Sequence, residues 1–83
     1  MSYKKGDIVS SASGAWVMII KDRIMDGHAR VFAICDTGTL YVGEYYGWYH
    51  RLATEEEKSR LFKFLLKKGY SWDEENLQLI QEL

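Results

Sequence analysis

The chain has 83 residues, of which 47% are hydrophobic and 28% charged, and its formal net charge is −1. This size allows one domain with one modest core, and the composition excludes a disordered chain. Residues 1–53 contain six Lys and Arg against five Asp and Glu, and residues 54–83 contain five against seven. Neither part therefore has the strongly basic character of a general nucleic-acid binder.

Short apolar runs separated by glycine and aspartate predict strands and turns in the first part of the chain. The expected strands are Asp7 to Ser10, Ala15 to Lys21, Ala29 to Cys35, and a fourth that begins at Leu40 to Val42. The segment from Asp22 to Gly27 is expected to be a loop, with Asp26-Gly27 as its turn signal. These segments predict a small bent antiparallel sheet or an SH3-like barrel over residues 7–50.

The only cysteine, Cys35, excludes an intramolecular disulfide, and its apolar surroundings indicate a small core residue. A small chain without a disulfide framework is typical of a reducing compartment. We find no signal peptide after Met1, and the longest apolar run, Ala15 to Ile20, is too short to span a bilayer. The sequence therefore predicts a cytoplasmic protein with no membrane contact.

The period of the pattern becomes helical after residue 53. Thr54 followed by Glu57 is a capping box, in which each side chain bonds the backbone amide of the other residue. Acidic residues after Thr54 and basic residues before Gly69 suit the two ends of a helix dipole. We expect one helix over about 55–68, ended by Gly69 in a left-handed conformation.

The tail from Gly69 to Leu83 admits two interpretations. Tyr70 and Trp72 alternate with a polar residue, which favours a β-hairpin with its turn after Asp73. A short final helix beginning at Asp73 is the competing interpretation. With the hairpin, the chain is expected to be a single α+β domain over 1–83, with a β-rich part (1–53) followed by the helix and hairpin (54–83).

The segment from Arg51 to Asp73, RLATEEEK followed by LF, L and GYSWD, resembles a module in uncharacterised small proteins of phages and prophages of gut bacteria. Lys5-Gly6-Asp7-Ile8-Val9 also resembles the opening strand of those proteins and of many SH3-like barrels. The resemblance implies a barrel-plus-helix architecture and a phage context, in which the cytoplasm is that of a bacterial host cell. No functional residue is carried over, because the family has no established activity.

Five of the twelve aromatic residues fall between Tyr41 and Arg51, on what is expected to be a loop. Tyrosine and tryptophan offer large rigid contact areas with a polar edge, which suits a binding surface. In an extended segment, neighbouring side chains point to opposite faces, so some of these rings must be exposed. The candidate ligand-binding residues are Trp16, Tyr45, Tyr46, Trp48, Tyr49, His50 and Arg51.

Each candidate also has a plainer interpretation. The rings of the run can form the lid of a small core, Trp16 can be a core anchor, and His50 can be structural. Arg51 can bind phosphate beside a stacked base, or it can make a salt bridge near the start of the helix. The sequence alone does not choose between these interpretations.

No catalytic, metal-binding or nucleotide-binding signature is found, so we expect no enzymatic activity, no cofactor and no metal. The preferred hypothesis is a small phage-type binding protein, with counter-defence as its role. It would sequester a nucleotide-type ligand or block a host protein through the aromatic run, and a homo-oligomer would enlarge its shallow site. The alternatives are a nucleic-acid-binding SH3-like module and a structural component of a virion.

Overall fold

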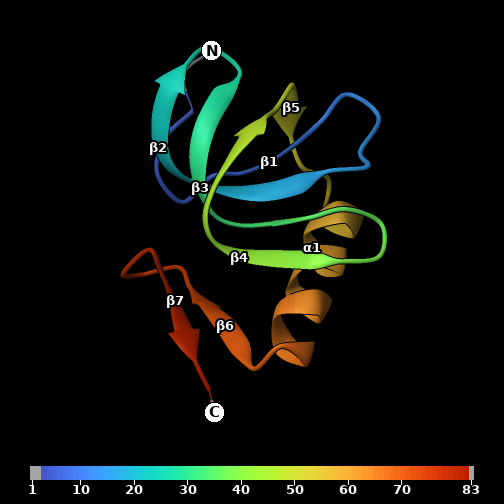
Figure 1. Cartoon of the computed structure of the whole chain (residues 1–83), viewed down its shortest axis with the longest axis vertical. Coiled ribbons are helices and arrows are strands. Elements are labelled where there is room, and N and C mark those ends of the chain that lie inside the picture. The colour runs from blue at the N-terminus through green and yellow to red at the C-terminus, as the bar shows by residue number, and fades with distance from the viewer. Residues whose placement is uncertain (1–2, 83) are drawn as a thin grey trace.

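The computed structural model describes residues 3–82, an α+β fold that contains one helix, a five-stranded antiparallel sheet and a two-stranded hairpin (Figure 1). The elements in chain order are β1 (Ile8–Ser10), β2 (Val17–Met25), β3 (His28–Cys35), β4 (Leu40–Trp48), β5 (Arg51–Leu52), α1 (Glu55–Lys67), β6 (Tyr70–Asp73) and β7 (Gln78–Gln81). The predicted α+β class is confirmed.

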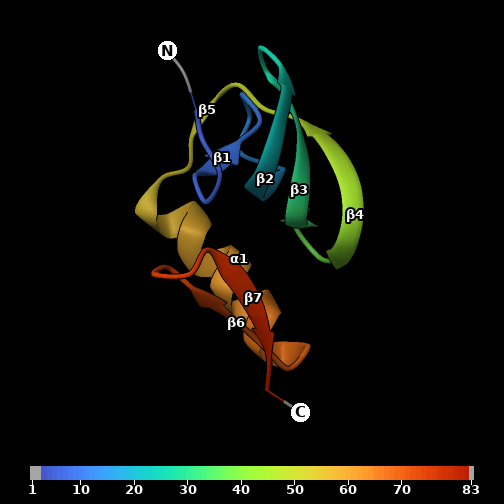
Figure 2. The same ribbon diagram turned by 90° about the vertical axis from the view of Figure 1, so that its left-hand side faces the viewer.

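The five-stranded sheet has the order β4-β3-β2-β1-β5 and is not closed into a barrel. Figure 2 shows β4 as a bent strand on the outer side of the sheet, with β5 on the opposite side. Tyr49 and His50 carry the chain across the end of the sheet, where their amides donate to Gly27 and Ser10. The prediction of a closed SH3-like barrel is therefore wrong and that of a bent open sheet is correct. The two edge strands, β4 and β5, do not pair with each other.

The hairpin of β2 and β3 is longer than the sequence predicts. Strand β2 continues to Met25, which pairs with His28, so only Asp26 and Gly27 remain as the turn. Gly27 has φ +75°, a left-handed conformation that glycine adopts without strain. The predicted Asp-Gly turn is confirmed, and the predicted loop over residues 22–27 is wrong because residues 22–25 continue the strand with all four side chains exposed, which leaves no alternation of buried and exposed residues.

The aromatic run lies on a strand, so its prediction as a loop is also wrong. Strand β4 covers nine residues and pairs with β3 over its length. The pairing is irregular at one place, where Gly43 and Glu44 of β4 lie opposite the single residue between Val31 and Ala33. The two glycines that indicated a loop, Gly43 and Gly47, have other functions in the strand. Gly43 has φ +132° at this irregularity, and Gly47 is buried where β4 lies against the sheet.

Helix α1 begins at the predicted cap. The Thr54 hydroxyl accepts from the Glu57 amide at 3.2 Å, and the Glu57 carboxylate accepts from the Thr54 amide at 2.9 Å. The helix ends at Lys67, and Gly69 follows with φ +83°. The capping box, the helix and its glycine stop are confirmed.

The tail forms the predicted hairpin rather than a final helix. Strands β6 and β7 pair from Tyr70 with Gln81 to Asp73 with Gln78. The Asp73 carboxylate accepts from the amides of Glu75 and Asn76 and so closes the turn. Trp72 packs on Phe32 of β3, with 5.2 Å between ring centroids, and attaches the hairpin to the sheet.

Buried side chains lie on both faces of the five-stranded sheet. One cluster lies on the face towards α1 and joins Ile19, Cys35 and Leu40 to Leu61 and Leu65 of the helix. The other cluster contains Met18, Ile20, Val31 and Ile34 with the buried ring of Tyr49. Cys35 is a fully buried core residue, as predicted, and burial raises the pKa of its thiol.

Candidate functional site

Strand β4 divides the aromatic residues between the two faces of the sheet. Residues that pair across antiparallel strands lie on the same face, and successive residues alternate. Tyr45 pairs with Val31, whereas Tyr46 pairs with Arg30 and Trp48 with His28. Tyr45 therefore lies on the face opposite to Tyr46 and Trp48, which is the alternation that the sequence predicts for an extended segment.

Three rings on one face make the set that we call the Trp16 group, namely Trp16, Tyr41 and Tyr45. Trp16 and Tyr41 are stacked at 6.5 Å between centroids, and Tyr41 meets the edge of Tyr45 at 5.7 Å. Trp16 is 40% exposed and all three rings are exposed large side chains. In this structure Trp16 is therefore an exposed ring immediately before β2, and Val17 and Met18, which follow it, are fully buried.

A shallow groove adjoins Trp16. It has a volume of about 240 Å³ and is lined by Trp16, Met18, Ile34, Tyr46, Gly47 and Trp48. Gly47 keeps the groove open, because a Cβ atom there would lie 2.5 Å from Met18 Sδ and 3.3 Å from Ile34 Cδ1. The groove is thus an apolar hollow whose lining includes three of the predicted binding residues, Trp16, Tyr46 and Trp48, although by register the last two belong to the other face of β4.

The other face carries what we call the Trp48 group, made of His28, Tyr46 and Trp48. The imidazole of His28 is stacked on Trp48 at 4.2 Å with 10° between the planes, and Tyr46 lies 6.0 Å from the same imidazole. Tyr46 is 62% exposed and Trp48 is 64% exposed, so most of each ring contacts solvent. His28 Nδ1 is buried and has no hydrogen-bond partner within residues 3–82.

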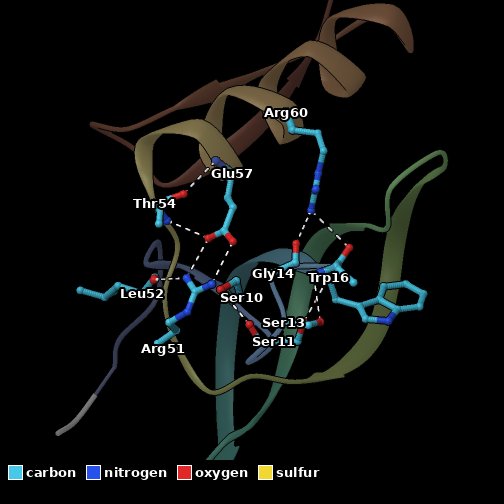
Figure 3. Close-up of polar contacts among 11 residues, drawn as sticks. Ser10, Ser11, Ser13, Gly14, Trp16, Arg51, Leu52, Thr54, Glu57 and Arg60 are labelled. Carbon is cyan, nitrogen blue, oxygen red and sulfur yellow. Dashed lines mark hydrogen bonds and ion pairs between the residues drawn. The ribbon is translucent and has the colours of Figure 1, made fainter.

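The three remaining candidates lie apart from these rings. Tyr49 is buried in the second cluster, where its ring meets Tyr3 edge-to-face at 5.2 Å. His50 is exposed on the connection between β4 and β5. Arg51 begins β5 and points towards the start of α1 rather than towards β4 (Figure 3).

Arg51 makes the salt bridge that was one of its two interpretations. Its guanidinium donates to both carboxylate oxygens of Glu57, at 2.8 and 3.0 Å, and also to the Leu52 carbonyl at 3.2 Å. The bidentate pair and the Thr54 amide lower the pKa of Glu57 to about 2, and the carboxylate raises the pKa of Arg51. Arg51 therefore fixes the helix start to β5.

A second arginine fastens the loop that precedes Trp16. Arg60 Nη2 donates to the carbonyls of Gly14 and Ala15, at 2.6 and 3.2 Å. In the same loop, Ser11 Oγ accepts from the Trp16 amide and the Ser11 amide donates to the Trp16 carbonyl. Figure 3 shows the Trp16 ring pointing away from these polar contacts, so the loop holds the ring outwards.

The cations nearest the rings are paired with carboxylates. Arg30 donates to Asp22, and each group shifts the pKa of the other in the direction that favours its charged form. Lys21 lies 4.0 Å from Glu44 and also above the Phe32 ring. The surface around the Trp48 group thus carries charged side chains of both signs, and each positive charge lies beside a negative one.

His28 and Tyr41 belong to the two ring groups, although sequence reasoning did not include them among the candidates. His28 was missed because the strand containing it was expected to begin at Ala29. The register of the β2–β3 hairpin was the missing signal, since an Asp26-Gly27 two-residue turn places His28 in a strand. Tyr41 was missed because the break in alternation at Gly43 and Glu44 is not visible in the residue pattern.

Groups of three or more His, Cys, Asp and Glu side chains that could hold a metal ion are not found among residues 3–82. In the same part of the chain, α1 is the only helix, and it is neither long nor apolar enough to cross a membrane. Comparisons with protein-family models, curated proteins and solved structures gave no match to this chain. The resemblance to phage proteins therefore stays a prediction.

Proposed function

We propose that the chain is a non-enzymatic binding protein whose strand β4 holds a partner protein through the Trp48 group. The observation that carries this proposal is the exposure of Tyr46 and Trp48, at 62% and 64%, on one face of one strand. Interface centres are enriched in tryptophan and tyrosine, which bury much area at a small cost in side-chain entropy. A rigid sheet displays these rings without needing to order a loop on binding.

A small planar ligand is the second candidate, and the groove beside Trp16 supports it. Its volume of about 240 Å³ is below the range of roughly 300–1,000 Å³ typical of small-molecule sites. The salt bridge of Arg51 with Glu57 removes the phosphate ligand that a nucleotide would need beside the rings. These two facts make a protein partner the better supported of the two, with a nucleotide-type ligand retained for testing.

The phage resemblance supports counter-defence by blocking a host protein as the biological role. Among the rival functions, a nucleic-acid-binding module predicts affinity that falls steeply with salt. The net charge of −1 and the paired cations near β4 weigh against that function. A structural role in a virion predicts large assemblies instead of a defined complex.

Site-specific photo-crosslinking in bacterial cells tests the proposal. A photoreactive amino acid is placed at Tyr46 or Trp48, and at Leu66 as the control, because Leu66 is 67% exposed but lies on α1. We expect positions 46 and 48, but not position 66, to give a discrete crosslinked product whose mass differs from that of two joined copies of this chain. The purified partner should then bind the wild type at least tenfold more tightly than Trp48→Ala, with Leu66→Ala unchanged.

Thermal-shift measurements with linear and cyclic nucleotides test the second candidate. A ligand at 100 times its dissociation constant adds about 2.7 kcal/mol of stability. If a nucleotide clearly raises the melting temperature and Trp16→Ala abolishes this rise, the groove rather than the Trp48 group is the binding site. If positions 46 and 48 give no crosslink to a protein other than this chain, the protein-partner proposal is contradicted whether or not a nucleotide binds.

A further inference from the structure

Among the residues that the structure describes, strand β4 has one unpaired edge. It stands at the end of the strand order, with β3 as its hydrogen-bonded neighbour in the sheet. Figure 2 shows its outer side facing away from β1, β5 and the helix. A nine-residue edge strand is a template for pairing with another strand, and such edges are usually shortened, charged or covered. The edge of β4 carries a single charged residue, Glu44.

The backbone groups on that edge follow from the register. The Tyr49 amide donates to the Gly27 carbonyl at 2.8 Å, which makes Tyr49 and Gly27 a hydrogen-bonded pair. Antiparallel pairing alternates, so Gly47 and Tyr45 also direct their backbone groups towards β3. The N–H and C=O groups of Tyr46 and Trp48 therefore point to the open edge of β4.

Tyr46 and Trp48 are two residues apart and direct their side chains to one face of the strand. Glu44 lies at the irregularity before them, and its carboxylate is on the same side, 4.0 Å from Lys21 Nζ, which lies above the Phe32 ring packed against the cluster towards α1. The three side chains therefore form a row. The row has Tyr46 at its centre, a carboxylate at one end, and at the other an indole, whose N–H is a donor. Such a row is complementary to itself when it is turned by 180° about Tyr46.

We propose that a second copy of this chain pairs with β4 about a two-fold axis at Tyr46, which joins the two sheets into one continuous sheet. Tyr46 then lies opposite Tyr46 of the second copy, and Glu44 lies opposite Trp48. The indole N–H can donate to the carboxylate, and the His28 ring stacked on Trp48 lies beside that contact. The interface is isologous, as in most homodimers.

Charge and strand length favour a two-fold axis at Tyr46 over an axis at Glu44 or Trp48. An axis at Glu44 would place two carboxylates directly opposite each other, which destabilises a strand pair. An axis at Trp48 would leave most of β4 without a partner, because the strand ends at that residue. The chain's net charge of −1 adds little repulsion between copies.

This inference concerns the edge of β4, whereas the proposed function concerns the ring faces. An experiment can therefore contradict the dimer without contradicting partner binding, and the reverse. The dimer would place two copies of the Trp48 group side by side on one surface. A partner protein would then meet rings from both copies.

Disulfide crosslinking tests the register. Opposed residues in an antiparallel pair have Cα atoms about 4.5–5.5 Å apart, within the range that a disulfide spans. The native Cys35 is fully buried and does not compete. Under mild oxidation, Tyr46→Cys should form a covalent dimer by itself, whereas Glu44→Cys and Trp48→Cys should crosslink at least tenfold faster mixed than either does alone. Leu66→Cys on the exposed helix face is the control for random collision.

Sedimentation equilibrium of the unmodified protein supplies the second measurement. We expect a mass that rises with concentration towards twice the 9.7 kDa of one chain. Tyr46→Pro removes the outward N–H without removing a bond to β3, so the folded variant should remain monomeric, while Tyr46→Phe should still dimerise. A wild type that stays monomeric at every concentration, or a mixture of Glu44→Cys and Trp48→Cys that crosslinks no faster than Leu66→Cys, would overturn the proposal.

Discussion

Gly47 determines how closely β4 approaches the second cluster of the sheet. A Cβ atom at this position would lie 2.5 Å from Met18 Sδ, closer than side-chain atoms normally approach. The same atom would project into the groove beside Trp16, whose lining includes both Gly47 and Met18. The absence of a side chain at position 47 thus links the packing of β4 to the shape of the candidate site.

We expect Gly47→Ala to lower the free energy of unfolding by about 1 kcal/mol, since Met18 is flexible and can move aside. Gly38→Ala is the matched control, because a Cβ atom at Gly38 meets no other atom within 4 Å. Urea unfolding followed by circular dichroism measures both variants. Equal stability of the two variants would contradict the close packing of β4 on Met18.

Glu57 connects the helix cap to the salt bridge of Arg51, and its pKa of about 2 predicts a pH dependence. The folded-state pKa lies below the ordinary value of 4.5, so the unfolded state binds the proton more tightly. The stabilisation is therefore complete above pH 4.5 and is lost as the pH falls through the folded-state value. Solvent screens the pair, because the Arg51 side chain is 37% exposed.

We expect Glu57→Gln to lose about 1 kcal/mol of stability at pH 7, a value reduced for this screening. The difference from wild type should shrink steadily as the pH falls from 4.5 towards 2. Glu56→Gln is the control, since Glu56 is an exposed residue of the same helical turn. A difference that is the same at pH 7 and pH 2.5, measured by thermal unfolding, would show that the charge pair is unimportant.

The role of a residue could be predicted from the sequence where the residue that it contacts lies only a few positions away in the chain. The Thr54–Glu57 capping box depends on residues three apart in a helical turn, and the residue types alone identify it. The two interpretations of Arg51 could not be separated, because Glu57 is six residues away and meets Arg51 only after β5 has paired with β1. The choice depends on tertiary structure, which local patterns do not contain.

Among the elements, the hairpin of β6 and β7 depends on docking for its order. An isolated two-stranded hairpin is marginally stable in water, and this one contacts the sheet through Trp72 on Phe32. Its strands were predictable because the rings of Tyr70 and Trp72 alternate with polar residues before a turn that Asp73 closes.

We expect Trp72→Ala to release the hairpin while leaving the five-stranded sheet folded. Amide hydrogen exchange should become at least tenfold faster in β6 and β7 and remain slow in β2 and β3. Ile80→Ala is the control, because Ile80 is in the same hairpin but is exposed. Uniformly faster exchange throughout the chain would instead show that the hairpin and the sheet unfold as one unit.

Strand β4 is the element that the sequence pattern misassigned. An edge strand with exposed rings on both faces has no apolar–polar alternation, and glycine in such a segment usually indicates a turn. Here Gly43 lies at the irregularity in the pairing with β3, and Gly47 lies in close contact with Met18. The rings were identified as candidates from their composition, whereas their division between two faces required the register with β3.

On the scale of the whole molecule, the α+β class and the order of most elements could be predicted, but the form of the sheet could not. Whether five strands close into a barrel depends on whether the edges meet, and the strand order shows β4 and β5 apart. The open edge of β4 and the exposed rings are therefore properties of the assembled fold. They are the features on which both functional proposals depend.

The central claim is that the rings of the Trp48 group serve recognition rather than stability. The most direct measurement is the free energy of unfolding of the double variant Tyr46→Ala with Trp48→Ala, followed by circular dichroism in urea. Because both rings are mostly exposed, the claim predicts a loss of no more than about 1 kcal/mol. Leu61→Ala, in the buried cluster, should lose about 2–5 kcal/mol under the same conditions. A loss in the double variant as large as that of Leu61→Ala would contradict the claim and make the rings part of the core.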